Sequence, residues 1–178
     1  MQLISDQYRE QQAHLHATTE YGTASIGYAP KVAEVVNKFG VEEILDYGAG
    51  RLNLIKTIHK HKLVQHPFRY TPYEPANPDY ADAPEPSDMV VCIDVLEHIE
   101  PELLENVLDD LKRVTKWIGF FTVDCRPAKK VLPDGRNAHL IQESADWWMP
   151  KLMERFDLHM FQRTNGGFMV LVANKDMQ

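Results

Sequence analysis

Two kinds of apolar spacing alternate along this chain, and they predict strands and helices in turn. Short apolar runs predict strands at 43–46, 68–73, 89–93 and 117–123. Apolar residues at helical spacing predict helices that open at Pro30, follow Gly50, open at Pro101 and follow Ser144. Strands that alternate with helices in this way predict an α/β fold with a mainly parallel sheet.

The chain ends differently from the rest of this pattern. Apolar runs at 157–162 and 168–174 are joined by Arg-Thr-Asn-Gly-Gly, which is a hairpin signal, so we expect these last strands to be antiparallel. Pro72 cannot donate to a sheet ladder and places the run at 68–73 near a sheet edge. The proline-rich interval 74–88 is too short for a crossover helix and a further strand. We therefore expect the third strand to be absent or vestigial and the sheet to have six strands.

The chain is expected to divide into an N-terminal arm, residues 1–28, and a main domain, residues 29–178. The arm is rich in Gln, His and Thr, is weakly helical at its start, and is too polar to form core. It ends in the flexible run Gly22 to Gly27. A polar segment of this kind is expected to act as a lid over a ligand.

The segment Asp46-Tyr47-Gly48-Ala49-Gly50 is the most informative in the chain. It reads as a buried strand that ends in an acid, followed by a glycine turn and a helix. The glycines let the backbone pass close to a ligand, and the following helix presents N–H groups to it. A carboxylate before this turn suits a ligand that carries positive charge. The segment therefore points to a nucleotide-like cofactor with an amine or sulfonium, S-adenosylmethionine.

Composition narrows the possible partners. The 178 residues carry a formal net charge of −7, with no lysine- or arginine-rich cluster beyond Lys129-Lys130 and the mixed segment 56–62, so nucleic acid is not favoured. The longest apolar runs are too short to span a bilayer, and the first residues lack the order of a signal peptide. Cys92 and Cys125 lie in apolar surroundings, as reduced thiols do. We expect a cytoplasmic protein that does not associate with membranes.

From about Val32 onward the sequence resembles the class I S-adenosylmethionine-dependent methyltransferase family. The glycine turn after Asp46 resembles its first motif, Glu74 resembles the acid that ends the second strand, and 88–99 resembles the motif of the fourth strand. The terminal hairpin matches the antiparallel end of that fold. The resemblance implies a Rossmann-like methyltransferase domain. Leu52 departs from the family's pattern, because it stands where the third glycine of the first motif is usual.

The resemblance also implies where the cofactor lies. The acid matching Asp46 holds the methionyl amine, the turn of Gly48, Ala49 and Gly50 passes beside the methionyl part, and Glu74 takes both ribose hydroxyls. The acid matching Asp82 accepts from the adenine amino group. The expected cofactor-binding set is completed by Tyr21, whose ring can face the sulfonium, and by Pro75, Asp94 and Val95.

The acceptor side is expected to involve Asp94, His98 and His139. His98 is the best candidate for a general base or for a group that orients the acceptor, with a purely structural hydrogen bond as the alternative. Asp94 sits just past the fourth strand and could face the methyl group or the acceptor, or simply cap a turn. His139 lies where the family often places substrate-facing residues. A small-molecule acceptor is expected, and S-adenosylhomocysteine is the product that the resemblance implies.

Other functions fit the sequence less well. A nicotinamide dehydrogenase would need glycine where Asn53 stands. Cys125 ends a predicted strand, as the nucleophile of some RNA cytosine methyltransferases does, but it lacks the rest of that signature. No metal site is expected, because the remaining histidines lack companion ligands at recognised spacings: His14 with His16, and His59 with His61 and His66. A cofactor-binding regulatory or inactive subunit is the main alternative, and a homo-oligomer or a regulatory partner is possible.

Overall fold

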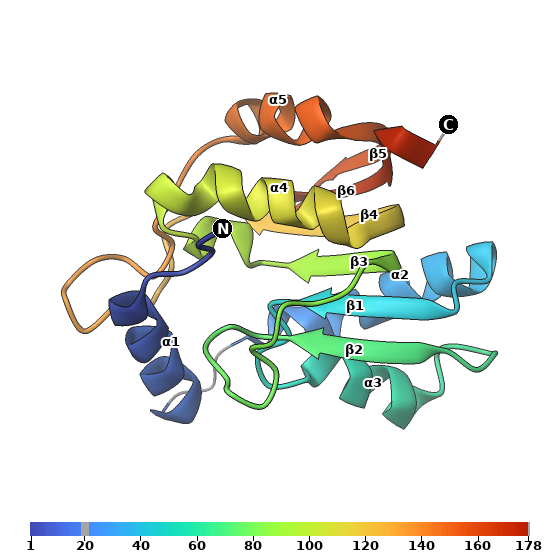
Figure 1. The fold of residues 1–178 in the computed structure, drawn as a ribbon, viewed down its shortest axis with the longest axis horizontal. Helices are drawn as coiled ribbons and strands as arrows, with labels where there is room; N and C mark the ends of the chain where they lie inside the picture. The colour runs from blue at the N-terminus through green and yellow to red at the C-terminus, as the bar shows by residue number, and fades with distance from the viewer. Residues whose placement is uncertain (19–21, 178) are drawn as a thin grey trace.

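The computed structural model describes residues 1–18 and 22–177. Within these residues, six strands form one sheet in the order β2-β1-β3-β4-β6-β5 (Figure 1). The strands are β1 Glu43–Tyr47, β2 Arg69–Tyr73, β3 Ser87–Ile93, β4 Thr115–Asp124, β5 Phe156–Arg163 and β6 Gly167–Asn174. Each lies within a few residues of the run that predicted it.

The pairing of the strands confirms the predicted fold. β1 is parallel to β2 and β3, and β3 is parallel to β4. β6 is antiparallel to both β4 and β5, so the predicted hairpin closes this end of the sheet. β2 forms the other edge, as Pro72 indicated. Between β2 and β3 the described chain contains no helix and no strand, so the expected loss of the third strand is confirmed.

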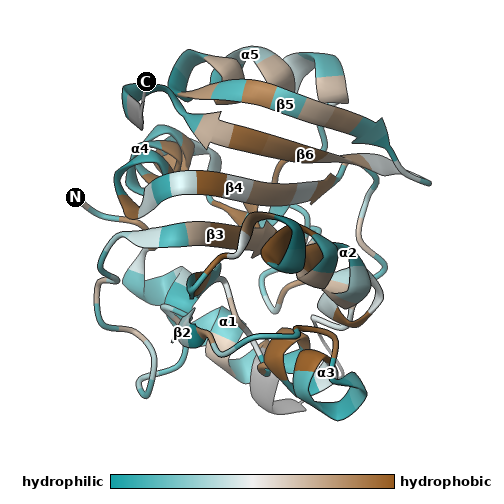
Figure 2. Cartoon of the chain, turned by 90° about the vertical axis from the view of Figure 1, so that its right-hand side faces the viewer, coloured by the Kyte–Doolittle hydropathy of each residue, from teal (hydrophilic) through white to brown (hydrophobic). Residues whose placement is uncertain are grey.

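Helices cover both faces of the sheet, which gives three layers. α2 and α3 lie on one face, and α4 and α5 lie on the other (Figures 1 and 2). Within the described residues, no helix has the length and apolar character needed to cross a membrane. The helices are α1 Asp6–Thr18, α2 Ala24–Phe39, α3 Asn53–His61, α4 Leu104–Val114 and α5 Ala145–Arg155, with short 3₁₀ turns η1 Leu96–His98, η2 Pro101–Leu103 and η3 Lys175–Met177.

Each face of the sheet buries its own hydrophobic cluster. Val32 and Val36 of α2 pack with Leu54 and Ile58 of α3 on one side. The apolar stripes of α4 and α5 pack on the other side, together with Phe121 of β4. β3 is buried along most of its length because it contributes to both clusters. The sheet therefore holds the carboxyl ends of its parallel strands firmly at one edge.

The helix expected to open at Pro30 begins six residues earlier, at Ala24, and Pro30 lies inside it. A proline in a helix interior removes one backbone hydrogen bond, so the residues before it must be held by packing. Ala29 is fully buried, and the Tyr28 ring meets Phe120 edge to face at a centroid distance of 6.2 Å. These contacts keep the preceding turn helical, and α2 therefore crosses the expected boundary between arm and domain at residue 28.

The expectation that the arm is too polar for core is also wrong. Ile4, Tyr8 and Leu15 are buried in a small cluster with Leu132 and Ala138. A helix with few apolar residues can still bury them when they share one face. Tyr8 and Leu15 of α1, with Ile4 just before it, do so on a loop more than a hundred residues later in the chain. The first part of the arm is thus packed onto the domain.

Two adjacent tryptophans in α5 provide a matched test of the hydrophobic core on the α4–α5 face of the sheet. Trp148 has no exposed surface, whereas Trp147 is 37% exposed and lies beside Lys151. We expect Trp148→Ala to lower the free energy of unfolding by about 3–5 kcal/mol, because it leaves a large cavity in the core. Trp147→Ala should cost less than about 1 kcal/mol. Urea unfolding followed by circular dichroism measures both, and equal losses would contradict the assigned core.

Candidate functional site

A cavity of about 620 Å³ opens at the carboxyl ends of the parallel strands. It is lined by the turns that follow β1, β2, β3 and β4, by the start of α2, and by side chains of α1 and the segment before it. Open α/β sheets bind ligands at this edge because the connections diverge there. The position of the cavity is therefore a direct consequence of the strand order.

The turn after β1 brings bare backbone into the cavity. Gly48 and Ala49 donate their N–H groups to the Tyr73 carbonyl, at 2.8 and 2.9 Å, which ties this turn to the end of β2. Gly48 has a φ of 84°, and a Cβ placed on it would lie 2.4 Å from Cγ2 of Val95. Only glycine fits this position, since a side chain would be strained and would also collide with Val95.

Glu74, at the end of β2, is buried and held in a single orientation by two backbone groups. Its Oε2 accepts from the Gly50 N–H at 3.1 Å, and its Oε1 accepts from the Ala76 N–H at 3.2 Å. Each carboxylate oxygen has a second lone pair, so both can still accept from a ligand. Because Glu74 lines the cavity beside the glycine turn, it can bind a pair of hydroxyl groups there.

Asp46 lies below the turn and is 4% exposed. The Tyr70 hydroxyl of the neighbouring strand donates to its Oδ2. Burial raises the pKa of Asp46 to about 7; the hydrogen bond from Tyr70 opposes this shift, and the negative charge of Glu74 adds to it. A positively charged ligand group in this part of the cavity would offset that repulsion and favour the ionised carboxylate.

Asp94 follows β3 in a left-handed conformation, with a φ of 50°. It accepts from the Thr122 hydroxyl of β4 at 2.5 Å, and its own N–H points to that hydroxyl at 3.0 Å. Burial raises the pKa of Asp94, and the bond from Thr122 opposes the shift. A left-handed aspartate costs free energy that the surrounding contacts must offset, and such residues gather at functional sites.

Two histidines meet at the far wall of the cavity. Nδ1 of His98 lies 2.7 Å from the Ala138 carbonyl, and Nδ1 of His139 lies 2.6 Å from the Arg126 carbonyl. Their rings meet edge to face with centroids 4.7 Å apart. The turn η1 and the segment after β4 therefore place both imidazoles together, although they are far apart in the sequence.

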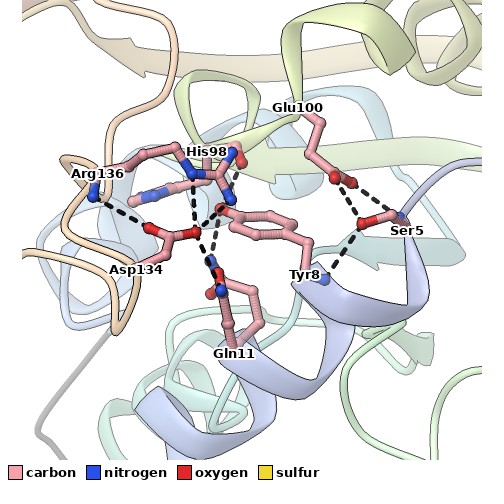
Figure 3. Close-up of polar contacts among 8 residues, drawn as sticks. Ser5, Tyr8, Gln11, His98, Glu100, Asp134 and Arg136 are labelled. Carbon is pink, nitrogen blue, oxygen red and sulfur yellow. Dashed lines mark hydrogen bonds and ion pairs between the residues drawn. The ribbon is translucent and has the colours of Figure 1, made fainter.

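Helix α1 is bonded to the loops that carry this wall (Figure 3). The Tyr8 hydroxyl donates to the backbone carbonyl of His98 at 2.6 Å. The N–H and hydroxyl of Ser5 both donate to the carboxylate of Glu100, at 2.8 and 2.6 Å. Asp134 accepts from Gln11 at 3.0 Å. The first part of the arm thus closes one side of the cavity.

Comparison with known proteins gives fold neighbours only. No family model and no curated protein matches the sequence. Among solved structures, 1,6-didemethyltoxoflavin-N1-methyltransferase of Burkholderia thailandensis, crystallised with 1,6-didemethyltoxoflavin and S-adenosylhomocysteine, aligns with a TM-score of 0.64 at 14% identity, over 98% of this chain and 92% of that one. The chain has the class I methyltransferase fold. The methyltransferase fold explains both the terminal hairpin and the glycine turn at the edge of the sheet.

Further neighbours share this methyltransferase fold. Magnesium protoporphyrin IX methyltransferase of Synechocystis, with bound S-adenosylhomocysteine, aligns with a TM-score of 0.56 at 13% identity, over 98% of this chain and 90% of that one. Mitomycin 7-O-methyltransferase aligns with a TM-score of 0.62 at 16% identity, over 92% of this chain. The alignment spans only 60% of that longer enzyme.

Most residues that the sequence proposed for the methyltransferase site line the cavity. They are Asp46, Gly48, Ala49, Gly50, Glu74, Pro75, Asp94, Val95, His98 and His139. Asp82 is exposed in the loop between β2 and β3 and does not line it, so its role at an adenine ring stays a prediction. Tyr21 lies outside the described residues.

Sequence reasoning missed several residues that line this cavity. The missed cavity residues include Tyr8, Gln12, Thr23, Ser25, Asp124, Arg126, Lys129 and Lys130. It also missed Glu97, which precedes His98 and is completely buried. An acid directly before a histidine, at the end of a buried strand, was the available signal for Glu97. The residues from α1 were expected only collectively, as part of a lid, because only the folded chain shows which of them reach the cavity.

The raised pKa of Asp46 predicts a pH-dependent stability. Its folded pKa of about 7 exceeds the ordinary 3.8, so the folded state binds the proton more tightly. The stability that this proton provides is fully present below about pH 4 and is lost as the pH rises through 7. Relative to Asp46→Asn, the wild type should therefore lose up to about 4 kcal/mol between pH 4 and pH 8, of which roughly 2.5–3 kcal/mol falls between pH 5 and pH 8. Urea unfolding of both proteins at pH 5 and pH 8 measures the difference, and parallel curves would contradict it.

Proposed function

We propose that this chain is an S-adenosylmethionine-dependent methyltransferase that acts on a small-molecule acceptor. The observation that carries the proposal is the glycine turn held against the buried carboxylate of Glu74. Together they present unhindered backbone and two hydroxyl-binding oxygens at the carboxyl edge of the sheet. Two of the fold neighbours described above were crystallised with S-adenosylhomocysteine, and the substrates in their names are small molecules.

The charges around the turn fit such a cofactor. Asp46 and Glu74 are both buried beside the cavity, and their mutual repulsion favours a ligand with positive charge. Asp46 would hold the methionyl amine, Glu74 would bind the ribose hydroxyls, and Gly48 leaves room for the chain that joins them. When bound, S-adenosylmethionine supplies a methyl group already activated by its sulfonium.

The residues of this chain would then align the acceptor and take its proton. Asp94, His98 and His139 line the cavity together, beyond the glycine turn. His98 and His139 each have Nδ1 against a backbone carbonyl, so the lone pair of the neutral ring lies on Nε2. Either nitrogen could accept the proton of an amine or hydroxyl acceptor as its bond to the methyl carbon forms. Alignment alone contributes up to about 7–11 kcal/mol in favourable cases.

Calorimetry with S-adenosylhomocysteine tests the cofactor assignment. Glu74→Gln replaces one accepting oxygen by a donor and removes the charge, so affinity should fall by about tenfold or more, equivalent to about 1.4 kcal/mol. Glu85→Gln makes the same change at an exposed residue of the same loop and should bind as the wild type does. Absence of binding in the wild type would contradict the proposed function. Equal affinity in all three proteins would contradict the role assigned to Glu74.

Turnover is tested separately with a panel of small hydroxyl, amine and thiol acceptors and labelled cofactor. Label transfer to one acceptor class would support the enzyme. Tight cofactor binding without transfer to any member, including nucleic acid and peptide controls, would favour a regulatory or inactive subunit instead.

We also propose that the arm closes over the bound cofactor. The contacts of Ser5, Tyr8 and Gln11 place α1 beside the cavity, where closure would exclude water. Hydrogen exchange across α1 should slow when S-adenosylhomocysteine is added, whereas exchange in α5, which contributes no residue to the lining of the cavity, should not change. Identical exchange in α1 with and without ligand would count against a lid.

A further inference from the structure

Glu97, His98 and His139 form a cluster that the proposed reaction does not fully use. One potential ligand atom from each residue lies within 4.8 Å of the other two. Glu97 and His98 come from η1, and His139 comes from the segment after β4. The cluster therefore joins two loops at the wall of the cavity, where both imidazoles are lining residues.

The Glu97 carboxyl group is incompletely satisfied. Its Oε1 accepts from the Asp124 N–H at 2.9 Å, which fixes the orientation of the group. Its Oε2 is buried and has no hydrogen-bond partner among the described residues. The residue has no exposed surface. Because a buried carboxyl oxygen without a partner is costly, this atom indicates a ligand that the protein itself does not supply.

The two histidines are oriented as metal ligands usually are. Each Nδ1 lies within 2.7 Å of a backbone carbonyl, of Ala138 for His98 and of Arg126 for His139. A carbonyl can only accept, so each Nδ1 carries the proton and each Nε2 carries the lone pair. A backbone carbonyl on the other ring nitrogen is a common support of a metal-bound imidazole, since it sets the tautomer and the ring orientation.

We propose that Glu97, His98 and His139 bind a divalent first-row transition metal ion, with zinc as the expected metal. Two imidazole nitrogens and one carboxylate oxygen match catalytic zinc sites, which keep a further position open. Magnesium and calcium prefer all-oxygen sets and are disfavoured here. Both histidines line the cavity and Glu97 does not. The open coordination position of the ion would therefore face the cavity.

The position of this site suggests its use, which rests on the proposed function. A metal ion here would occupy Nε2 of both histidines and would therefore replace them in activating the acceptor. It would bind an oxygen or nitrogen of the acceptor, lower the pKa of that group so that its proton is lost to solvent, and hold it in line with the methyl carbon. Asp94 lies close enough to act on the charge of Glu97. The acceptor favoured by this arrangement is a molecule with a hydroxyl group able to ligate the ion.

Metal binding is tested on the full chain without cofactor or acceptor, so its outcome does not depend on methyl transfer. The protein is stripped with a chelator, titrated with zinc chloride in a calorimeter, and then analysed for bound metal by mass spectrometry. Cobalt(II) provides a second probe, because its visible absorption reports the geometry of its ligands. We expect one zinc ion per chain at this site and a rise in the thermal midpoint when it binds.

Substitutions assign the ion to the cluster. His139→Ala and Glu97→Gln should each weaken zinc binding by at least about tenfold. His159→Ala removes an exposed histidine of β5 and should bind as the wild type does. Glu97→Gln keeps the shape of the side chain and the acceptor for the Asp124 N–H, so circular dichroism should show it folded.

Two results would overturn the proposal. One is a wild-type chain that binds no zinc or cobalt, and the other is binding that persists unchanged in both His139→Ala and Glu97→Gln. In the first case Glu97 would be a neutral buried acid, and Glu97→Gln would leave the thermal midpoint unchanged with or without zinc. In the second case the ion would belong to other histidines on the surface. Loss of metal binding together with intact cofactor binding would leave the proposed function standing.

Discussion

The carboxyl edge of this sheet depends on burying acidic groups, each of which must be held by a donor from a neighbouring element. Without such donors the buried carboxylates would cost more than the packing around them contributes. In every case the donor comes from the adjacent strand or turn. The pairs are Asp46 with Tyr70, Glu74 with Gly50, Asp94 with Thr122, and Glu97 with Asp124. The order of the parallel strands therefore both creates the cavity and determines which acids can line it.

These acids also repel one another at this edge of the sheet. Burial and mutual repulsion raise the pKa of Asp46, Asp94 and Glu97, so the protein alone does not neutralise this region. The two ends of the cavity differ in the kind of ligand group that their side chains favour. Near the glycine turn, Asp46 and Glu74 favour a ligand that carries both a cationic group and hydroxyl groups. Near His98, the additional imidazoles favour a metal ion or an acceptor that gives up a proton.

The sequence predicted what depends on local periodicity and on the glycine turn, and missed what depends on distant segments meeting. The terminal hairpin, the edge position of the strand with Pro72 and the missing third strand all follow from short patterns. The helix containing Pro30 was placed too late, because packing by Ala29 outweighed the local preference of proline. His98 and His139 were each proposed singly. The carbonyls that orient both rings, of Ala138 and Arg126, lie in the segment after β4, far from His98 in the sequence. Glu97 gave no sign that one of its oxygens would be buried without a partner.

The contacts of α1 determine when the structure can be completed during synthesis. Its polar partners, His98, Glu100 and Asp134, and its apolar partners, Leu132 and Ala138, all lie about ninety residues or more after it. Contacts at such separations close long loops and form after local ones. Helix α1 leaves the ribosome before its partners but is therefore among the last elements to dock, because it must wait until the chain beyond Ala138 has emerged. Until then its apolar face is exposed, and the wall of the cavity around His98 lacks the support of Tyr8.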